Sequence, residues 1–350
     1  MNCCTECFSS NYLKDIINRN NTIGDCDFCG TKKVSIYNPA ELSLIFQNIL
    51  DLYSVHPDSI NSIETQIEID FQNKIFSEKI GLNTKLLLQN IVKDDYGAYQ
   101  SLFENNVVLT CSNLPESIDI IKPLQISWEK FADEIKTTNR FHIQNTLDLE
   151  KLQELLIRYK KPINKGKKFY RARISTKEGF VKSDMLNPPA DKAKAGRANP
   201  TGISYLYLAD QIKTTLYEAR ASLFDYVTVG EFRAKEDIKV INLRGDTYDP
   251  VLLAEQEELE DFLIHLPFIT TLETNLSKPR RRSDNELDYL PTQYLSEFIK
   301  SIGFDGVEFQ SSLFSGGYNL AIFTPDKFEC ISVNVFEIEN IDLKEKKCKP

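Results

Sequence analysis

The stretch GRANPTGISYLYLADQIKTTLYEAR, from Gly196 to Arg220, decides how the second half of this sequence folds. It begins with a loop rich in glycine and proline. In ISYLYLA, which follows, the alternation of residues predicts a short strand with Tyr207 on one face. Asp210 can cap the next helix, which carries Glu218 about two turns in. A loop arginine, Arg197, a strand tyrosine and a helix carboxylate could therefore meet around one ligand.

Short predicted strands of similar composition lie on both sides of this stretch. KFYRARI, YVTVGEFRA, KVINL, GVEFQSS, NLAIF and CISVNVFEI are rich in β-branched and aromatic residues, and helical stretches lie between them. We therefore expect an α+β fold with a mixed or mainly antiparallel sheet over residues 161–340. The polar segment KKPINKGKK marks its start, and residues 341–350 form a charged tail.

The N-terminal segment, residues 1–38, contains five of the eight cysteines. Two Cys-x2-Cys pairs are separated by 18 residues, a spacing typical of structural Zn²⁺ sites. Four thiolates would close a tetrahedron and leave no open position for chemistry. The predicted ligands are Cys4, Cys7, Cys26 and Cys29. Cys3 is the alternative to Cys4.

Residues 39–160 have mostly helical periodicity. PAELSLIFQNIL and LDLEKLQELLIRY each place apolar residues along one helical face. No nucleophile, base and orienting group cluster in this segment. We therefore expect a helical domain with a packing or regulatory role.

Composition and charge narrow the function classes. With 41% hydrophobic and 27% charged residues the chain is globular, and it has no apolar run long enough for a membrane span. The N-terminus lacks the pattern of a signal peptide, so we expect a cytoplasmic protein with reduced thiols and no membrane contact. The net charge of −9 argues against general nucleic-acid binding. Residues 151–200 nevertheless contain 14 Lys and Arg against four Asp and Glu, which favours binding of an anion near the loop that carries Arg197.

Further candidate site residues flank the opening stretch. Arg171 and Arg173 stand two apart in YRAR, so a strand would project both from one face. Guanidinium groups can bind a phosphate through paired hydrogen bonds. In GVEFQSSLFSGGYNLAIF, Ser311 and Ser312 follow a predicted strand, and a glycine pair then allows close backbone approach to a ligand.

The motifs YRAR, GRANPTG, YLYLA, TLYEAR and GFDGVEFQSS…GGYNLAIF, in this order, resemble the RES domain. This family is named for an arginine, a glutamate and a serine, and its members are mostly bacterial toxins. The resemblance extends over about half of the chain, from Lys168 to Ile338. By position, the family arginine falls on Arg197, the glutamate on Glu218, and the serine on Ser311 or, with a shifted turn, on Ser312.

Two more positions match the family and one departs from it. The strand tyrosine of the family falls on Tyr207, and its early arginine falls on Arg171. After the motif arginine the family usually has an aromatic residue and asparagine, whereas this chain has Ala198 and Asn199. Part of the expected stacking surface is therefore absent or supplied elsewhere.

The resemblance implies an ADP-ribosyltransferase-like mixed sheet and NAD⁺ as the substrate. Arg171 and Arg197 would neutralise the diphosphate, and Tyr207 would stack on the nicotinamide ring. Glu218 would stabilise the oxocarbenium-like ribose as the base departs, without a metal. Ser311 would position the ribose or the carboxamide. Should Glu218 not act, the alternative carboxylates are Glu231 and Glu308.

The resemblance leaves the nucleophile open. Water would give a glycohydrolase, inorganic phosphate a phosphorylase, and a protein side chain a mono-ADP-ribosyltransferase. We expect consumption of free NAD⁺ first and protein modification second. A catalytically inactive NAD-binding module is the third alternative.

The zinc and helical segments resemble the N-terminal extension of some RES proteins, which is related to the helical HEPN class. In HEPN ribonucleases the arginine and the histidine stand further apart in the sequence. Here Arg140 and His142 are only two positions apart, which argues against ribonuclease activity. Because NAD⁺ depletion is toxic to its host, we expect the activity to be restrained. The restraint could be an antitoxin, a trigger protein sensed by the N-terminal segments, or homo-oligomerisation, as in a phage-defence effector.

Overall fold

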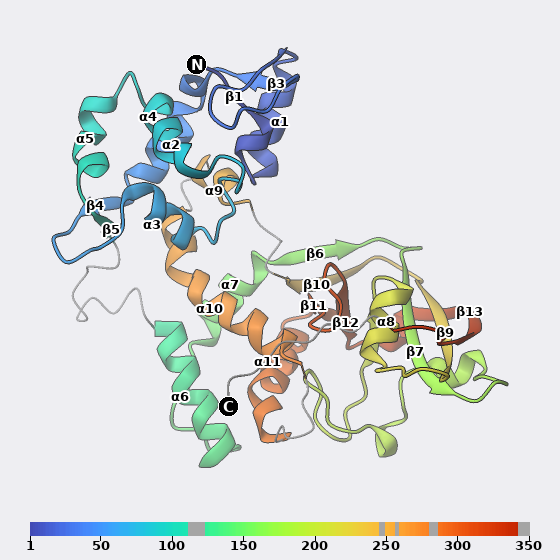
Figure 1. Ribbon diagram of the computed structural model, residues 1–350. Helices are drawn as coiled ribbons and strands as arrows, with labels where there is room; N and C mark the ends of the chain where they lie inside the picture. The colour runs from blue at the N-terminus through green and yellow to red at the C-terminus, as the bar shows by residue number, and fades with distance from the viewer. Residues whose placement is uncertain (111–122, 245–248, 256–258, 280–285, 342–350) are drawn as a thin grey trace, which may run out of the picture. The chain divides into compact units, whose positions relative to one another are not determined.

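The structure is a computed structural model that describes residues 1–110, 123–244, 249–255, 259–279 and 286–341 (Figure 1). The chain divides into two compact units, which are described separately. The first unit combines Met1–Pro123 with Tyr248–Pro267, and the second combines Leu124–Thr247 with Phe268–Pro350. The predicted tail 341–350 lies outside the described residues except for its first residue. The predicted boundaries at residues 38, 160 and 340 stay predictions.

The first unit is mostly helical and opens with a small antiparallel sheet in the order β1-β3-β2. A second, two-stranded sheet pairs β4 with β5. The strands are β1 (Cys3–Cys4), β2 (Ile23–Gly24), β3 (Val34–Tyr37), β4 (Tyr53–Val55) and β5 (Val107–Leu109). The helices are α1 (Asn11–Arg19), α2 (Ser43–Leu50), α3 (Ile63–Asp70), α4 (Thr84–Ile91), α5 (Tyr96–Glu104) and α9 (Pro250–Glu255).

One carboxylate ties the segment that begins at residue 248 to the N-terminal helix. Asp249 Oδ2 accepts hydrogen bonds from Ser10 Oγ at 2.8 Å and from Tyr12 N at 2.9 Å. Its Oδ1 accepts from Val251 N at 3.1 Å. Asp249 therefore satisfies backbone donors at the starts of both α1 and α9, groups that a helix cannot satisfy internally.

The second unit contains an eight-stranded sheet in the order β13-β9-β7-β8-β12-β11-β10-β6. Among the strand pairs of this sheet that the structure describes, β10–β11 alone is parallel, so the α+β fold with a mixed sheet predicted from the sequence is confirmed. The strands are β6 (Lys160–Ile163), β7 (Lys168–Ser175), β8 (Leu206–Ala209), β9 (Tyr226–Ala234), β10 (Ile238–Leu243), β11 (Gly306–Gln310), β12 (Tyr318–Ile322) and β13 (Phe328–Glu337).

Helices of this unit precede the sheet and connect its strands. They are α6 (Pro123–Thr137), α7 (Leu149–Ile157), α8 (Ile212–Glu218) and α11 (Leu290–Ser301), together with the C-terminal part of α10 (Leu259–Ser277), whose N-terminal part belongs to the first unit. Short 3-10 helices include η5 (Lys182–Met185) and η7 (Glu286–Tyr289). Within the described ranges, no helix is both long and apolar enough to cross a membrane.

The sheet is nearly interrupted between β7 and β8, and α8 lies at this point. A single pair, Tyr170 with Ala209, joins the two strands. Beyond it, the backbone N–H of Ala172 donates to Thr215 Oγ1 of α8 at 2.7 Å. Figure 1 shows α8 against β7. A helix therefore takes the place beside β7 where the N-terminal residues of β8 would have paired in a continuous sheet, and this position places the end of α8 near the centre of the sheet.

The register assigns side chains to two faces of the sheet. Since Tyr170 pairs with Ala209, and residues alternate along a strand, Tyr207 shares a face with Tyr170. Arg171 and Arg173 lie on the opposite face, together with Leu208. That face contains a buried apolar cluster, formed by Ile163, Phe169, Met185, Leu206, Leu208, Phe232, Ala234, Ile238, Val240, Leu320, Ile322 and Phe328.

The first edge strand explains part of the basic segment 151–200. β6 is an edge of the sheet and has the sequence Lys-Lys-Pro-Ile, in which Lys160 and Pro162 are exposed. Charged residues and proline on an edge strand discourage pairing with another chain. These basic residues therefore have a structural use that does not require an anion.

Candidate active site and metal centre

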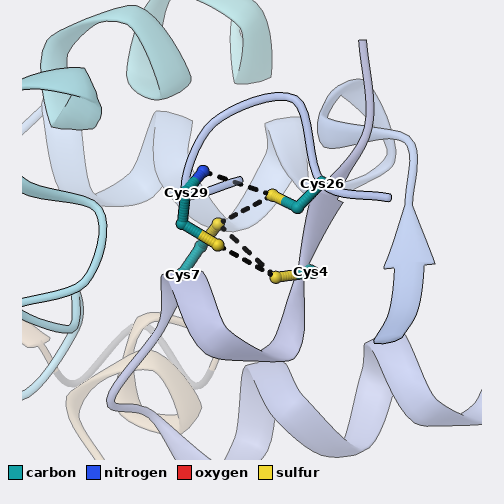
Figure 2. A group of neighbouring side chains, drawn as sticks. All are labelled: Cys4, Cys7, Cys26 and Cys29. Atoms are coloured by element: carbon teal, nitrogen blue, oxygen red, sulfur yellow. Dashed lines mark hydrogen bonds between the residues drawn. The ribbon is translucent and has the colours of Figure 1, made fainter. Parts of the chain in front are cut away.

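The four predicted cysteine ligands converge in the first unit (Figure 2). Their sulfur atoms all lie within 4.8 Å of one another. Cys4 Sγ is 3.4 Å from Cys29 Sγ and 3.9 Å from Cys7 Sγ, and Cys7 Sγ is 3.4 Å from Cys26 Sγ. A tetrahedral ion with metal–sulfur bonds of about 2.3 Å requires sulfur separations of about 3.8 Å. The donor set therefore fits a metal ion.

Cys3 is separate from this group. Its thiol donates to the backbone carbonyl of Tyr37 at 3.4 Å, and burial raises its pKa to about 12. Backbone N–H groups of Phe28 and Cys29 instead donate to Cys26 Sγ at 3.4 and 3.5 Å. These geometries select Cys4 over Cys3 as the fourth sulfur.

Glu218 is the centre of a hydrogen-bonded group in the second unit. It is the last residue of α8, and its Oε1 accepts from Ser311 Oγ at 2.7 Å and from Asn319 Nδ2 at 2.8 Å. Ser311 follows β11 directly and Asn319 lies in β12, so neighbouring strands supply the two donors. The Glu218 side chain is exposed, and its Oε2 makes no hydrogen bond to the part of the chain that the structure describes.

The structure distinguishes the two candidate serines. Ser311 is buried and, besides donating to Glu218, its Oγ accepts from Leu313 N at 3.3 Å and from Phe314 N at 3.2 Å. Ser312 is exposed. Ser311 is therefore the serine that meets the carboxylate, and its hydroxyl proton is already used in that contact.

Arg197 lies in the loop before β8 and shares an electrostatic environment with Glu218. Its Nη1 donates to the carbonyl of Leu276 at 2.9 Å. Burial lowers the pKa of the Arg197 guanidinium, and the negative charge of Glu218 acts in the opposite direction. Ser311 and Glu218 are therefore in direct contact, and Arg197 is near enough to Glu218 for their charges to interact.

Tyr207 contacts the loop that carries Arg197 through its hydroxyl group. The hydroxyl donates to Asn199 Oδ1 at 2.7 Å and accepts from Ala198 N at 3.2 Å. A Cβ atom on Gly196 would lie 2.7 Å from this hydroxyl oxygen and 2.6 Å from Asn199 Oδ1, so the close approach requires glycine there. Tyr207 is therefore joined to the arginine loop.

Arg171 and Arg173 do not join this group. They share a face, as predicted, but it is the face opposite Tyr207. Arg171 Nη1 donates to the carbonyls of Met185 at 3.0 Å and Leu186 at 2.5 Å. Burial, followed by the charge of Arg173, lowers the pKa of Arg171 to about 10. Arg173 donates to the carbonyl of Asp184 and places its guanidinium 4.3 Å from the ring centre of Phe180. Both arginines hold the η5 segment, and their assignment to a diphosphate stays a prediction.

The alternative carboxylates have other partners. Glu308 is fully buried, and its Oε1 accepts from Lys161 Nζ at 2.7 Å and from Arg244 Nη1 at 2.9 Å. Glu231 Oε1 lies 2.6 Å from Lys168 Nζ. Both glutamates are therefore paired with cations, in contrast to Glu218.

Sequence reasoning missed several residues of the site. Asn319 stands in the quoted motif GGYNLAIF, but nothing local marks its amide as a partner of Glu218. Gln293 of α11 binds the arginine loop across 97 residues of sequence. The glycine pair was expected to admit a ligand, yet a Cβ on Gly317 would overlap Thr214 of α8. The close approach at Gly317 is therefore between α8 and the turn that joins β11 to β12.

A family comparison agrees with the resemblance drawn from the motifs. The model of the RES domain family matches residues 168–342, which is half of the chain, and the chain belongs to this family. Among solved structures, the chain is similar to one from the M. tuberculosis MbcT–MbcA toxin–antitoxin complex. That likeness has 16% identity and a TM-score of 0.33, over 54% of this chain and 93% of the other. No curated protein matches the chain.

Proposed function

We propose that this RES domain protein is an enzyme that consumes free NAD⁺ by cleaving its nicotinamide N-glycosidic bond. The observation that carries the proposal is the environment of Glu218. Two uncharged donors hold one carboxylate oxygen, and the residue itself is exposed. Such donors fix the orientation of the carboxylate without cancelling its charge, as a site for a developing cation requires.

The reaction follows from the charges of NAD⁺. The bond between ribose C1′ and the nicotinamide nitrogen breaks, and its electron pair leaves with the base, which becomes neutral. Positive charge then develops on the ribose, and the second carboxylate oxygen of Glu218, Oε2, stabilises it and holds the ribose hydroxyls. Arg197 binds the diphosphate. Because the hydroxyl proton of Ser311 is committed to Glu218, we assign Ser311 to orienting the carboxylate.

The nucleophile completes the reaction by adding an electron pair to C1′. Water would release a proton to solvent and give ADP-ribose, whereas inorganic phosphate would give a phosphorylated ADP-ribose. Transfer to a protein side chain is the competing proposal. The role of Arg171, Arg173 and Ser312 in NAD⁺ binding remains a proposal from the sequence alone.

Product identification tests this function. The purified full-length protein is incubated with NAD⁺ that is labelled in its adenylate part, with and without inorganic phosphate. We expect nicotinamide release with a small labelled product, and the mass of that product distinguishes hydrolysis from phosphorolysis. Label attached to protein would instead support the transferase. Absence of nicotinamide release under every condition would contradict an enzymatic function and leave a binding module.

We also propose that the four cysteine thiolates hold a structural Zn²⁺. A bound zinc ion would supply folding free energy to the first unit and would have no open position for chemistry. Elemental analysis should find about one zinc per chain, and Cys7→Ser should lose it, whereas Cys3→Ser should retain it. Retention of zinc by Cys7→Ser would contradict this ligand set.

Restraint of the enzyme follows from its expected toxicity. We propose that an antitoxin, a trigger protein or a second copy of the chain controls the activity in the cytoplasm. Growth arrest on expression of the chain alone, relieved by Glu218→Gln, would support the expected toxicity and would favour a separate antitoxin over restraint by a second copy of the chain.

A further inference from the structure

Side chains from three elements hold the loop that carries Arg197. Tyr207 comes from β8, Asn199 from the loop itself, and Gln293 from α11. They converge on residues 194–203, and two of them, Asn199 and Gln293, are at most 5% exposed. The backbone around Arg197, the predicted ligand-binding arginine, is therefore held by polar side chains, two of which are buried.

The hydroxyl of Tyr207 is fully engaged in this loop. It donates its proton to Asn199 Oδ1 at 2.7 Å and accepts the backbone N–H of Ala198 at 3.2 Å. Burial raises the pKa of Tyr207, so the hydroxyl keeps its proton at neutral pH. Since Ala198 and Asn199 directly follow Arg197, the hydroxyl holds the backbone next to the arginine.

The side chain of Asn199 joins Tyr207 to several backbone groups of the loop. Its Nδ2 donates to the carbonyls of Lys194 at 3.1 Å, Pro200 at 3.1 Å and Ile203 at 2.8 Å. Its Oδ1 accepts from Tyr207. The side-chain amide therefore closes the loop on itself, and β8 fixes the closed loop in place.

α11 holds the same loop through backbone carbonyls. Gln293 Nε2 donates to Gly196 O at 2.8 Å and to Asn199 O at 3.1 Å, and Thr292 Oγ1 donates to Arg197 O at 2.7 Å. Carbonyls before, at and after the arginine are thus bound to one helix. A displacement of about 1 Å at a binding group is enough to weaken catalysis severely.

We propose that Tyr207 and Gln293 are positioning residues that set the backbone at Arg197, and that the hydroxyl of Tyr207 rather than ring stacking governs the affinity for a dinucleotide diphosphate. This inference rests on the proposed function, in which Arg197 binds that diphosphate. A loop that is ordered before the ligand arrives loses less conformational freedom on binding. Loss of either hydrogen-bonding group should therefore weaken binding without altering the carboxylate.

Removal of one hydroxyl separates the two roles of Tyr207. Tyr207→Phe keeps the ring but leaves Asn199 Oδ1 and Ala198 N without their partner, so KM for NAD⁺ should rise about tenfold with kcat nearly unchanged. Tyr205→Phe is the matched control. Tyr205 lies two residues earlier on the same face, and its buried hydroxyl has no hydrogen-bond partner within the described residues. This control should keep the wild-type KM.

A second pair of variants tests α11. Gln293→Met preserves the length of the side chain and removes both donors, so it should raise KM to a similar extent. Ser296→Ala is its control, since Ser296 is buried on the same helix and donates only within it, to Thr292 O. Combined with Tyr207→Phe, Gln293→Met should add less than its separate effect, because both act through one loop.

Amide hydrogen exchange gives a readout that does not depend on activity. Residues 196–199 should exchange faster in Tyr207→Phe and in Gln293→Met than in the wild type, and at the wild-type rate in both controls. Unchanged exchange in both variants would overturn the inference. So would a wild-type KM in Tyr207→Phe combined with a raised KM in Tyr207→Leu, the result expected for stacking.

The outcomes remain separable from those of the proposed function. If the wild-type protein neither binds nor cleaves NAD⁺, the proposed function fails, and with it the role assigned to these residues in binding. Faster exchange in the variants would then show only that Tyr207 and Gln293 stabilise the loop. If Tyr207→Phe unfolds, Gln293→Met decides the inference by the same KM and exchange measurements.

Discussion

Glu218 and Glu308 are two carboxylates of the same unit, and their surroundings are opposite. Glu218 is exposed, and its partners Ser311 and Asn319 are uncharged. Glu308 is fully buried, and its partners Lys161 and Arg244 are cations. One carboxylate keeps a negative charge at the surface, whereas the other has its charge neutralised in the interior.

The difference is the one expected between the reactive carboxylate proposed here, Glu218, and a structural one. A buried ion needs close opposite charges to offset its desolvation, and Glu308 has two of them. A carboxylate that must stabilise a cation needs orientation without neutralisation, and Ser311 and Asn319 provide this for Glu218. Exposure and partner charge therefore assign the roles better than the residue type, which is the same at both positions.

The largest expected effect comes from Glu218→Gln. This change preserves size and removes the charge that stabilises the ribose cation, so nicotinamide release should fall by about 10²- to 10³-fold. NAD⁺ binding, measured by calorimetry, should stay within a few-fold of the wild type. Wild-type turnover in this variant would contradict the role proposed for Glu218, and Glu231 and Glu308 would then be tested in its place.

Glu308→Gln should affect stability in place of chemistry. It leaves Lys161 and Arg244 without their counter-charge, and removal of one partner from a buried ion pair typically costs about 3 kcal/mol. Urea titration should detect this loss in the free energy of unfolding, while the folded fraction keeps its kcat. A kcat loss as large as that of Glu218→Gln would contradict the structural role.

Ser311→Ala and Asn319→Ala test the orientation of the reactive carboxylate. Each removes one donor to Glu218 Oε1, and we expect kcat to fall about tenfold with KM little changed. Ser315→Ala, an exposed serine in the same turn, is the control and should match the wild type. Equal effects in all three variants would indicate disturbance of the turn and not of the carboxylate.

Lys161→Met should have the smallest effect. The Lys161 side chain is 34% exposed, whereas that of Arg244 is 16% exposed, and Arg244 still pairs with Glu308 after the change. Solvent screening limits the contribution of the lysine, so the free energy of unfolding should fall by about 1 kcal/mol. A loss as large as that of Glu308→Gln would show that both cations are required to neutralise Glu308.

Local patterns predicted the parts of this molecule that local geometry determines. The cysteine spacing identified the four sulfur atoms that converge, and alternation in YRAR correctly put Arg171 and Arg173 on one face. Alternation could not say which face, because this depends on the pairing of Tyr170 with Ala209. That pair forms between strands separated by a long loop, which no period in the sequence describes.

Contacts between distant segments account for the rest. Gln293 binds the arginine loop from a helix whose own pattern indicates only an amphipathic surface. Asn319 occupies a strand position that β propensity disfavours, and its contact with Glu218 gives the reason. A polar residue in an otherwise apolar strand is thus a signal that sequence reasoning could have used.

The return of residues 248–267 to the first unit means that no single cut in the chain yields two self-sufficient fragments. A fragment that begins at residue 161 would still contain α9, whose Val251 and Ala254 are buried in the intact protein, and Asp249 would lack Ser10 and Tyr12. These apolar side chains would then face solvent and favour aggregation. To express the RES region in isolation, residues 248–267 should therefore be replaced by a short linker, because truncation at residue 161 alone leaves them in the fragment.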